Sequence, residues 1–595
     1  MIIKDYHYPL YKVESRKDFK EMLDKTCERY GDELSFFEKE DNRGYTGISF
    51  NDFRKRVVAL VEALYDIGFN PRDKIGLIGK NCRKWAITYY AVTAGNFIVV
   101  PIDKEYREKE IESILLKSKL KGVIFENKYR EIFNKLKDKY DFLDILVSFH
   151  SEPNDQGNAN RPSVYSLDYL FDLGKNLLDN KNPGESKYES ITLNPDEVTS
   201  IIFTSGTTGR PKGVMLSQKN ILSNIVQMRQ LIWIDNNMTF LSVLPLHHVY
   251  ECTCGYLCLL HAGTKIAYAQ SLKHIGENIV EAGITNINVV PLLLEAFYRK
   301  IKDRIKSSFA NRIKFSIGLL VCALSEKLFG KNIRRKVFSE IHKKFGGKLD
   351  LFISGGAALK PEIAKFFRSI GFRVLQGYGI TECSPFLAGN RDRAFRDDAA
   401  GMPSPGCDIE IFEKDENGIG EIGVKGPNVM LGYYEEPELT ESAFYNGYFL
   451  TGDYGYLDKD NFLYIAGRKK DIIVTKNGKN IYPEEVESYY ADSNIIKEIV
   501  VKSRIDPESG DEVIIAHIHP DYEGVSSLLS KEIEELEESD IIPLVREEIK
   551  SNNRKISGFK RIRYFILHPE EFEKTTTRKI KRFLIKDSDD KVSVY

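Results

Sequence analysis

Residues 204–213 read TSGTTGRPKG, and the first six are all Ser, Thr or Gly. The apolar run 198–203 precedes them and is typical of a buried strand. Glycines let the main chain approach a ligand closely, and successive backbone N–H groups form a concavity that binds anions. Hydroxyl side chains add donors and Lys212 adds a point charge. We therefore expect a loop that binds nucleotide phosphates rather than a flexible linker.

This loop differs from the P-loop of many nucleotide-binding proteins. Counted from Gly206, the GxxxxGK pattern would need glycine where Pro211 stands. Another kind of nucleotide site is therefore expected.

Size and composition describe an ordinary globular protein of three or four structural units. The chain has 595 residues, of which 42% are hydrophobic and 29% charged. A net charge of −1 gives no global field that would favour nucleic acid. The opening residues have no apolar segment typical of a secretory signal, and the longest strongly apolar stretch, 317–324, is far below the roughly 20 residues of a membrane span. The eight cysteines lack a disulfide-scaffold spacing. We expect a cytoplasmic protein.

One group of cysteines leaves two interpretations open. Cys252, Cys254 and Cys258 follow His247 and His248, an arrangement that a metal site could use. The surrounding sequence is mostly apolar and its spacing matches no zinc signature, which favours buried small hydrophobic residues instead.

The fold class is predicted as α/β. Apolar runs at 74–79 and 97–102 read as buried strands, and amphipathic stretches at 50–67 and 109–120 read as helices. This alternation indicates βαβ subdomains with parallel sheets. Two further strands, at 349–353 and 372–375, each lead into a glycine-containing turn. Ligands of open α/β sheets lie at such carboxyl ends of strands.

The last third of the chain changes character twice. Residues 401–467 are glycine-rich with short alternating runs, which predicts a small, β-barrel-like part. After Gly467 the composition favours a compact α+β unit. We therefore predict a large N-terminal domain, residues 1–467, and a small mobile C-terminal domain, residues 468–595.

Between these regions lies a long helical stretch, residues 295–348, with expected breaks near Gly318 and Gly330. Its segment IGLLVCAL, residues 317–324, has basic neighbours. The favoured interpretation is a buried helix beside a solvated basic face. The alternative is peripheral contact with a membrane surface.

Four further motifs follow the phosphate loop in order: YGITE (378–382), FLTGDYG (449–455), GRKKD (467–471) and KTTTRKIKR (574–582). Together the five segments resemble the adenylate-forming superfamily of acyl-CoA synthetases, peptide-synthetase adenylation domains and luciferases. The segments PLHHVYE (245–251), SGGAAL (354–359) and VTKNGKNIYPEEVE (474–487) look most like bacterial long-chain fatty acyl-CoA synthetases.

The resemblance implies roles for individual residues around ATP. Glu382 would bind Mg²⁺, Thr381 would touch the α-phosphate, and Tyr378 would stack on adenine. Asp453 and Arg468 would reach the ribose. The remaining nucleotide-binding residues that it implies are Thr204, Ser205, Gly206, Thr207, Thr208, Gly209 and Lys212 for the phosphates, and Gly356 and Ala357 behind the adenine.

Other implied roles concern catalysis and movement. Lys579 would bridge the carboxylate substrate and the α-phosphate, although Arg578 stands where the superfamily usually has glycine. Lys470 would be the hinge, about which the small domain rotates to bring the segment around Gly478 toward coenzyme A. Gly355 and His248 would lie at the acyl pocket; for His248 a purely structural role is the alternative.

The implied reaction has two steps, in which ATP converts a carboxylate to acyl-AMP and the thiol of coenzyme A then displaces AMP. The leading hypothesis is a ligase for long- or medium-chain fatty acids. A fatty acyl-AMP ligase that loads an acyl carrier protein is the second hypothesis, and a non-catalytic nucleotide-binding protein is the third. Neither acyl chain length nor oligomeric state is readable from the residues.

Overall fold

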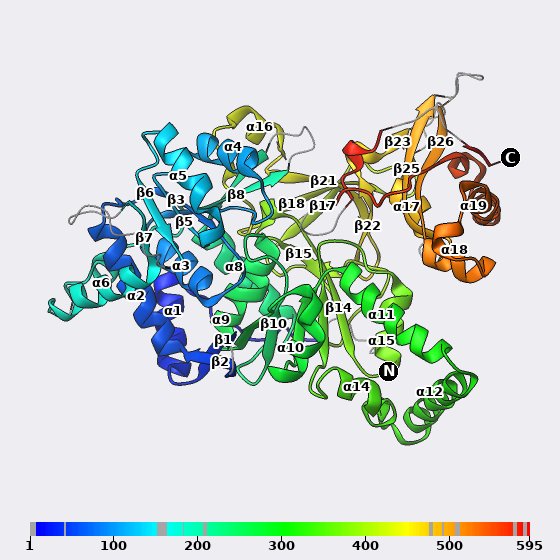
Figure 1. Cartoon of the computed structure of the whole chain (residues 1–595), viewed down its shortest axis with the longest axis horizontal. Coiled ribbons are helices and arrows are strands. Elements are labelled where there is room, and N and C mark those ends of the chain that lie inside the picture. The colour runs from blue at the N-terminus through cyan, green and yellow to red at the C-terminus, as the bar shows by residue number, and fades with distance from the viewer. Residues whose placement is uncertain are drawn as a thin grey trace. The chain divides into compact units, whose positions relative to one another are not determined.

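A computed structural model describes most of the chain. The described residues are 8–40, 43–150, 163–182, 184–205, 211–474, 480–490, 493–505, 512–574, 580–586 and 592–594, with only the backbone at 205, 474 and 512. The chain forms two compact units (Figure 1). The first comprises residues 1–408, 424–449 and 460–462, and the second comprises 409–423, 450–459 and 463–595. The predicted α/β class is confirmed, whereas the predicted domain boundary after Gly467 stays a prediction.

An eight-stranded sheet forms one half of the first unit. Its strands, in spatial order, are β19 (Gly432–Tyr433), β9 (Pro211–Ser217), β8 (Val198–Ser205), β4 (Ile98–Pro101), β3 (Lys74–Ile78), β5 (Gly122–Phe125), β6 (Ile145–Ser148) and β7 (Tyr165–Ser166). The helices that accompany it are α1 (Phe19–Tyr30), α2 (Phe50–Asp66), α3 (Arg83–Ala94), α4 (Glu108–Ser118), α5 (Arg130–Lys139), α6 (Leu167–Asp179), α7 (Lys187–Ser190) and α8 (Gln218–Leu231). From β8 to β7 the strands pair in parallel, as the βαβ alternation predicts.

A nine-stranded sheet forms the other half. Its order is β16 (Met402–Pro403), β15 (Phe386–Gly389), β14 (Arg373–Gly379), β13 (Leu351–Ser354), β12 (Asn286–Val289), β10 (Thr239–Ser242), β11 (Lys265–Tyr268), β1 (Leu34–Glu40) and β2 (Gly44–Ser49). The strands from β14 to β1 run parallel. Its helices include α9 (Cys258–Ala262), α10 (Ile275–Glu281) and α15 (Pro361–Ser369).

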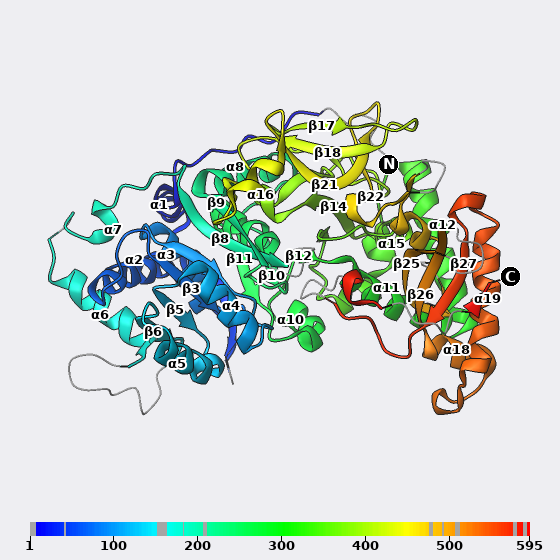
Figure 2. The ribbon, with the colours of Figure 1, turned by 90° about the horizontal axis from the view of Figure 1, so that it is seen from above.

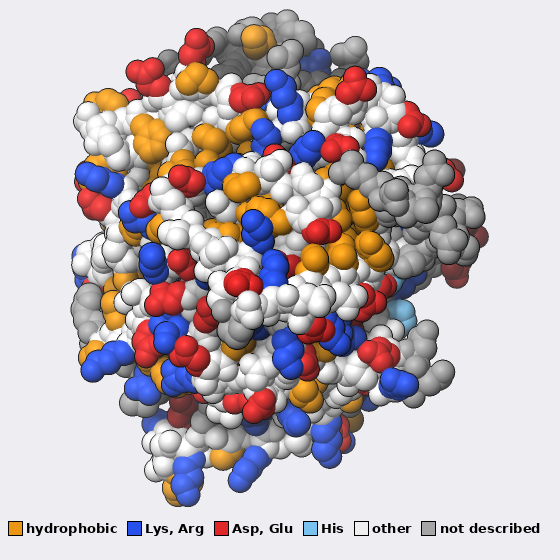
Figure 3. Space-filling view, turned by 90° about the vertical axis from the view of Figure 1, so that its left-hand side faces the viewer, with side chains coloured by type: hydrophobic (Ala, Val, Ile, Leu, Met, Phe, Trp, Pro, Cys, Tyr) orange, Lys and Arg blue, Asp and Glu red, His pale blue; other side chains and the backbone are white. Residues whose placement is uncertain are grey.

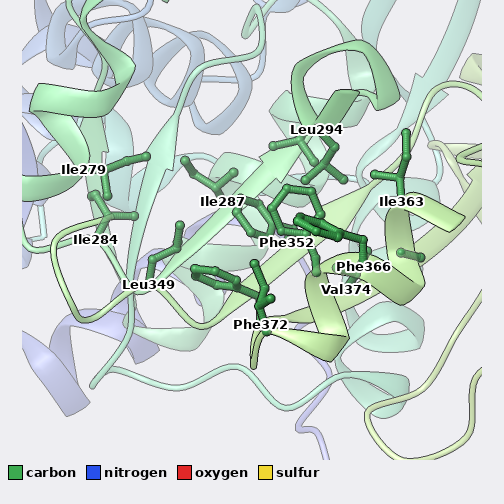
Figure 4. Packing of buried hydrophobic residues seen from close by; sticks show 14 of the residues in the cluster. Ile279, Ile284, Ile287, Leu294, Leu349, Phe352, Ile363, Phe366, Phe372 and Val374 are labelled. Carbon is green, nitrogen blue, oxygen red and sulfur yellow. The ribbon is translucent and has the colours of Figure 1, made fainter. Parts of the chain in front are cut away.

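An apolar cluster beside this sheet gathers phenylalanines from β13, from α15 and from the position just before β14. Phe352, Phe367 and Phe372 have ring centroids 5.3–6.0 Å apart, and Ile287 and Leu349 complete their surroundings (Figure 4). Because the interior is densely packed, this cluster fixes the position of the strands whose ends carry the candidate site.

The long helical stretch differs from its prediction. It forms α11 (Pro291–Lys306), α12 (Phe309–Phe329), α13 (Arg334–Val337) and α14 (Ser339–Lys344). The break predicted near Gly318 is wrong: the first break falls at Ser307–Ser308, where the Ser308 side chain caps α12. Gly318 lies inside α12. A Cβ at this position would stand 3.1 Å from Val337 Cγ1, so close packing, and not a break in the helix, accounts for the glycine. The break at Gly330 is confirmed, since this residue ends α12 in the left-handed conformation, φ +63°.

In the described part of the chain no single helix is both long and apolar enough to cross a bilayer. Only α11 and α12 taken together meet that criterion, and they are bent by 114° with respect to each other.

A five-stranded sheet, in which β21 pairs antiparallel with β20 and β22, provides the predicted small β part. Its strands are β17 (Asp408–Phe412), β18 (Gly420–Lys425), β21 (Tyr448–Leu457) and β20 (Phe444–Tyr445) in that order, with β22 (Leu463–Arg468) also paired to β21. The short helix α16 (Pro437–Ser442) precedes β20.

The C-terminal part of the second unit is the predicted α+β structure. Its sheet has the order β25 (Ile496–Ile505), β26 (Glu512–Pro520), β27 (Ile562–Leu567) and β28 (Val592–Ser593). The pair β23 (Ile473–Val474) and β24 (Asn480–Ile481) and the helices α17 (Pro483–Ser488), α18 (Tyr522–Leu529) and α19 (Glu538–Asn553) complete it (Figure 2).

Charges of both signs are interspersed over the surface seen in Figure 3, where Lys and Arg alternate with Asp and Glu. This face therefore offers no extended field of one sign.

The phenylalanine cluster generates a stability prediction. Phe352→Ala removes a ring with no solvent exposure, so it should lower the free energy of unfolding of the first unit by about 3–5 kcal/mol. Phe309→Ala is the matched control, because its ring is 73% exposed, and it should change stability by less than about 0.5 kcal/mol. Denaturant titration followed by circular dichroism measures both. Equal midpoints for the two variants would contradict the packing argument.

Candidate functional site

The candidate site lies at the carboxyl edge of the nine-stranded sheet. Because β12, β13 and β14 run parallel, with Val289 opposite Ser354 and Ser354 opposite Gln376, their carboxyl ends reach the same edge. The segment 355–357 follows β13, and the segment 380–382 follows β14. The structure therefore places two of the predicted motifs on neighbouring strands.

The predicted phosphate loop is the connection of a β-hairpin. Strands β8 and β9 pair antiparallel, with Thr204 opposite Lys212 and Ser205 opposite Pro211. The predicted residues Gly206, Thr207, Thr208 and Gly209 lie between these strands and outside the described residues. The base of the loop thus holds a hydroxyl and an ammonium group on adjacent strands.

A tyrosine that sequence reasoning missed lies between the two charged groups of the site. The phenol of Tyr433 donates a hydrogen bond to Glu382 Oε1 over 2.9 Å. The ammonium of Lys212 stands 5.3 Å from the centre of the same ring, at a separation typical of a cation–π contact. Burial, followed by the charge of Glu382, raises the pKa of the Tyr433 phenol, so the phenol keeps its proton.

The position of Tyr433 follows from strand pairing. The two-residue strand β19 pairs with β9, which sets Tyr433 opposite Val214, and the backbone N–H of Met430 donates to the carbonyl of Glu382 over 2.7 Å. A strand of two residues has no readable periodicity, so the sequence carries only the aromatic pair Tyr433–Tyr434 as a signal.

The glycines after β13 are explained by close packing and backbone conformation. A Cβ at Gly355 would stand 2.9 Å from the Tyr250 ring, whose hydroxyl donates to the Ile353 carbonyl over 2.9 Å. Gly356 has φ +84°, a conformation that favours glycine, and the space beside it is bounded by Val290 Cγ1 at 3.6 Å. On the neighbouring strand Tyr378 is half-buried, as is Thr381 beyond it.

The histidine pair before Tyr250 has a carboxylate partner that sequence reasoning also missed. His247 Nε2 lies 3.2 Å from Asp103 Oδ1, and both side chains are buried. Burial alone would raise the pKa of Asp103, but the contact with His247 more than offsets it and the pKa lies at about 2. Asp103 follows β4 at the carboxyl end of a parallel strand, which is the one signal that could have identified it.

His248 and Glu251 are held uncharged. Burial, and then the charge of His247, lowers the pKa of His248 to about 3. Burial raises the pKa of Glu251 to about 8, although Ser242 donates to its Oε1 over 2.6 Å. At neutral pH an imidazole and a carboxylic acid, both neutral, therefore lie in the segment predicted to border the acyl pocket.

The cysteine question is resolved by burial. Cys252, Cys254 and Cys258 are buried free thiols, and burial raises the pKa of Cys252 and of Cys258 to about 12. The described residues contain one group of three side chains close enough to hold a metal ion, Asp103 with His247 and His248, and it includes none of the cysteines. The cysteines are thus small apolar core residues.

In the second unit the predicted ribose-binding residues form a pair. Asp453 on β21 lies opposite Arg468 on β22, and Arg468 Nε stands 3.0 Å from Asp453 Oδ1. Gly452, with φ +69°, precedes Asp453 within the same strand, so the structure has no turn at this place. The predicted hinge residue Lys470 lies in the short 3-10 helix Lys469–Asp471, and burial lowers the pKa of its ammonium group.

Gly478 and Lys579 lie outside the described residues, so their roles stay predictions. The base of the segment that carries Lys579 is described: Lys574 and Ile580 form an antiparallel bridge. Lys574 also pairs with Glu498 and, over 2.6 Å, with Glu571. The two described residues that flank 575–579 in the sequence are therefore paired with each other.

The buried Asp103 predicts a pH dependence of stability. Its pKa in the folded protein is lower than the usual 3.8, so the carboxylate stabilises the fold above about pH 4 and loses this effect as the pH falls toward 2. The loss amounts to about 2 kcal/mol. Because a carboxyl with a pKa of about 2 is still mostly ionised at pH 3, only about 1 kcal/mol of this is lost between pH 5 and pH 3. In Asp103→Asn we expect the difference between the free energies of unfolding at pH 5 and pH 3 to be smaller by about that amount. Asp196→Asn, an exposed carboxylate, is the control and should behave as wild type; an unchanged slope in Asp103→Asn would refute the assignment.

Comparison with known proteins identifies the family. Residues 23–434 match the family described as AMP-binding enzyme. A long-chain-fatty-acid–CoA ligase, FadD15, from Mycobacterium bovis is 26% identical, over 91% of this chain and 90% of that protein. A long-chain-fatty-acid–[acyl-carrier-protein] ligase from Arabidopsis thaliana is also 26% identical, over 82% of this chain and 77% of that protein.

The fold is shared with solved structures. The o-succinylbenzoate CoA synthetase of Bacillus subtilis, solved with an acyl-adenylate intermediate, superposes with a TM-score of 0.71 at 18% identity, over 97% of this chain and 99% of that one. The resemblance to adenylate-forming enzymes is thereby confirmed, and the chain belongs to the AMP-binding enzyme family.

Proposed function

We propose that this protein is an ATP-dependent fatty acid:CoA ligase, which forms acyl-AMP from a long- or medium-chain carboxylate and transfers the acyl group to coenzyme A. Membership in the AMP-binding enzyme family supports the activation step. The relative that acts with CoA aligns with more of this chain than the carrier-protein relative does. This favours CoA as the acceptor over an acyl carrier protein.

The observation that carries the proposal is the arrangement of Lys212, Tyr433 and Glu382. Tyr433 contacts both charged groups: the Lys212 ammonium lies over its ring, and its phenol donates a hydrogen bond to Glu382. The ammonium is suited to phosphate and the carboxylate to a divalent ion. Polyphosphate and Mg²⁺ need these two charges side by side. Glu382 would hold Mg²⁺ with the hydroxyl of Thr381 nearby, and the bound ion would neutralise phosphate charge.

The adenine ring would lie beside Gly356, where an added Cβ would meet Val290 Cγ1 at an ordinary contact distance of 3.6 Å, with Ala357 behind it and Tyr378 on the neighbouring strand to stack on it. Asp453 and Arg468 would take the ribose.

In the first step a carboxylate oxygen of the fatty acid attacks the α-phosphorus and pyrophosphate leaves. Catalysis here consists mainly of positioning and charge neutralisation. Lys579 would supply positive charge where negative charge accumulates in the transition state. In the second step the CoA thiolate attacks the acyl carbon and AMP leaves. Because His248 is neutral at neutral pH, it can contact the acyl carboxylate as a hydrogen-bonding group without adding charge.

The decisive experiment measures pyrophosphate release with ATP, Mg²⁺ and a panel of carboxylates from acetate to oleate, and product formation with CoA or acyl carrier protein. We expect release with long- or medium-chain acids and a thioester with free CoA. A thioester with carrier protein alone would favour the acyl-AMP ligase. ATP binding with no release for any acid would favour a non-catalytic protein.

Lys579→Ala should reduce the rate of adenylate formation by about two to three orders of magnitude. Thioester formation from supplied acyl-AMP should change far less, because the lysine acts in the first step. Lys581→Ala removes a nearby cation, which lies 3.6 Å from Glu573, and serves as the matched control. An equal loss in both half-reactions for Lys579→Ala would refute the assigned role.

Lys470→Pro tests the hinge. Proline fixes φ, and a hinge residue must absorb a large change in φ and ψ, so the thioester step should slow more than the adenylation step. Lys470→Ala removes the same ammonium group but keeps the backbone free, and both steps should proceed. Second-step kinetics that are the same in wild type and Lys470→Pro would eliminate the hinge.

We further propose that the enzyme acts in the cytoplasm, as the sequence predicts, and that it makes a peripheral contact with a membrane, which was the alternative interpretation of the stretch 317–324. The scattered cysteines and the exposure of the apolar stretch 317–324 support this part of the proposal.

A further inference from the structure

Helix α12 is apolar on two opposite faces, and one of them packs against the protein. On this inner face Phe315 lies 5.3 Å from Phe338 and 6.0 Å from Phe366, measured between ring centroids. Gly318 and Cys322 are the buried positions of the helix. The inner face therefore accounts for the attachment of α12 to the first unit.

The outer face carries a continuous row of exposed apolar side chains. Leu320 is 59% exposed and Leu328 66%. The members of the row recur every three or four positions, which places them on one side of a helix; they are Phe309, Ile313, Ile317, Leu320, Val321, Leu324 and Leu328. The prediction that 317–324 is a buried helix is therefore wrong, because only one face of the helix packs. Figure 1 shows α12 at the periphery of the unit.

Cations border this row. Successive residues of a helix are rotated by about 100° around its axis, which places Lys327 at one edge of the apolar row and Lys314 at the other. Both side chains are exposed. Arg312 adds a third positive charge. The acidic residue of α12, Glu326, pairs with Arg334 over 2.6 Å. The helix thus presents an apolar face flanked by positive charge.

We propose that α12 docks the protein on an anionic membrane surface, with the apolar row at the acyl-chain boundary and the flanking lysines at the headgroups. Such an apolar face with Lys and Arg at its margins is the arrangement of helices that lie in a membrane interface. The inner face is occupied by protein, so α12 lies in the interface and does not cross the bilayer. The inference deepens the proposed function, because long-chain fatty acids partition into membranes.

A second copy of the chain fits the same face less well. A two-fold pairing of α12 with itself would bring the bordering lysines and arginine of both copies together, and like charges close to each other oppose association. Anionic headgroups complement these charges instead. Charge complementarity therefore favours an anionic membrane over a second copy of the chain as the partner of this helix face.

The test is co-sedimentation of the full chain with phosphatidylcholine vesicles, with and without phosphatidylglycerol, in the absence of ATP and fatty acid. We expect binding to the anionic vesicles that weakens with salt. The double variant Ile317→Glu/Leu324→Glu should lower the affinity at least tenfold. Leu272→Glu/Val280→Glu, which alters exposed apolar residues elsewhere in the first unit, is the matched control and should bind as wild type.

Two further measurements separate the alternatives. Lys314→Gln/Lys327→Gln should abolish the preference for anionic vesicles. Pyrophosphate release with detergent-solubilised fatty acid should be the same in all these variants, so a failure of docking is distinguishable from a failure of the proposed activity. Wild-type vesicle binding by Ile317→Glu/Leu324→Glu would overturn the proposal. So would a wild-type dimer, detected by analytical ultracentrifugation without vesicles, that this variant dissociates.

Discussion

The parallel alignment of β10, β12, β13 and β14 is the constraint on which the first unit's site depends. Neighbouring parallel strands have their carboxyl ends at the same edge of the sheet. The turns that follow them are therefore close in space, although the first begins after Ser242 and the last after Gly379, more than a hundred residues later. The buried cluster around Phe352 holds this register. These parts of the site are therefore positioned by strands and not by a long loop. Gly355 and Gly356 directly follow β13, and the segment that ends in Glu382 directly follows β14.

Charge is distributed unequally over the site. At the hairpin, Lys212 and Glu382 share Tyr433, so opposite charges are available where phosphate and a divalent ion would bind. Toward the segment 247–251, His248 and Glu251 are neutral at pH 7 because burial disfavours their charged forms. Asp103 is the exception, and its carboxylate Oδ1 lies 3.2 Å from His247 Nε2. A fatty carboxylate entering from that side would meet polar groups that are mostly uncharged.

The sequence predicted the elements that have strong periodicity and missed those that depend on packing. The helix expected at 50–67 is α2, and the strand expected at 74–79 is β3, because each carries its own apolar pattern. Tyr433 and Asp103 were missed for a different reason. One lies in a strand of two residues and the other follows a strand of four, and their partners are supplied by distant segments. Gly318 was misinterpreted as a break because the close approach of Val337 is a tertiary feature.

The basic run 574–582 is interpreted differently once its ion pairs are known. From the sequence alone it is a cluster of Lys and Arg side chains, which would usually be solvated. Within the second unit, however, Arg582 pairs with Glu487 of α17 and Lys574 with Glu498 of β25. The two described ends of the run are thereby paired with the sheet and with a helix, and Lys574 and Ile580 also form a bridge with each other. The described part of the run is therefore anchored to folded structure by ion pairs, and its charges are not those of a solvated tail.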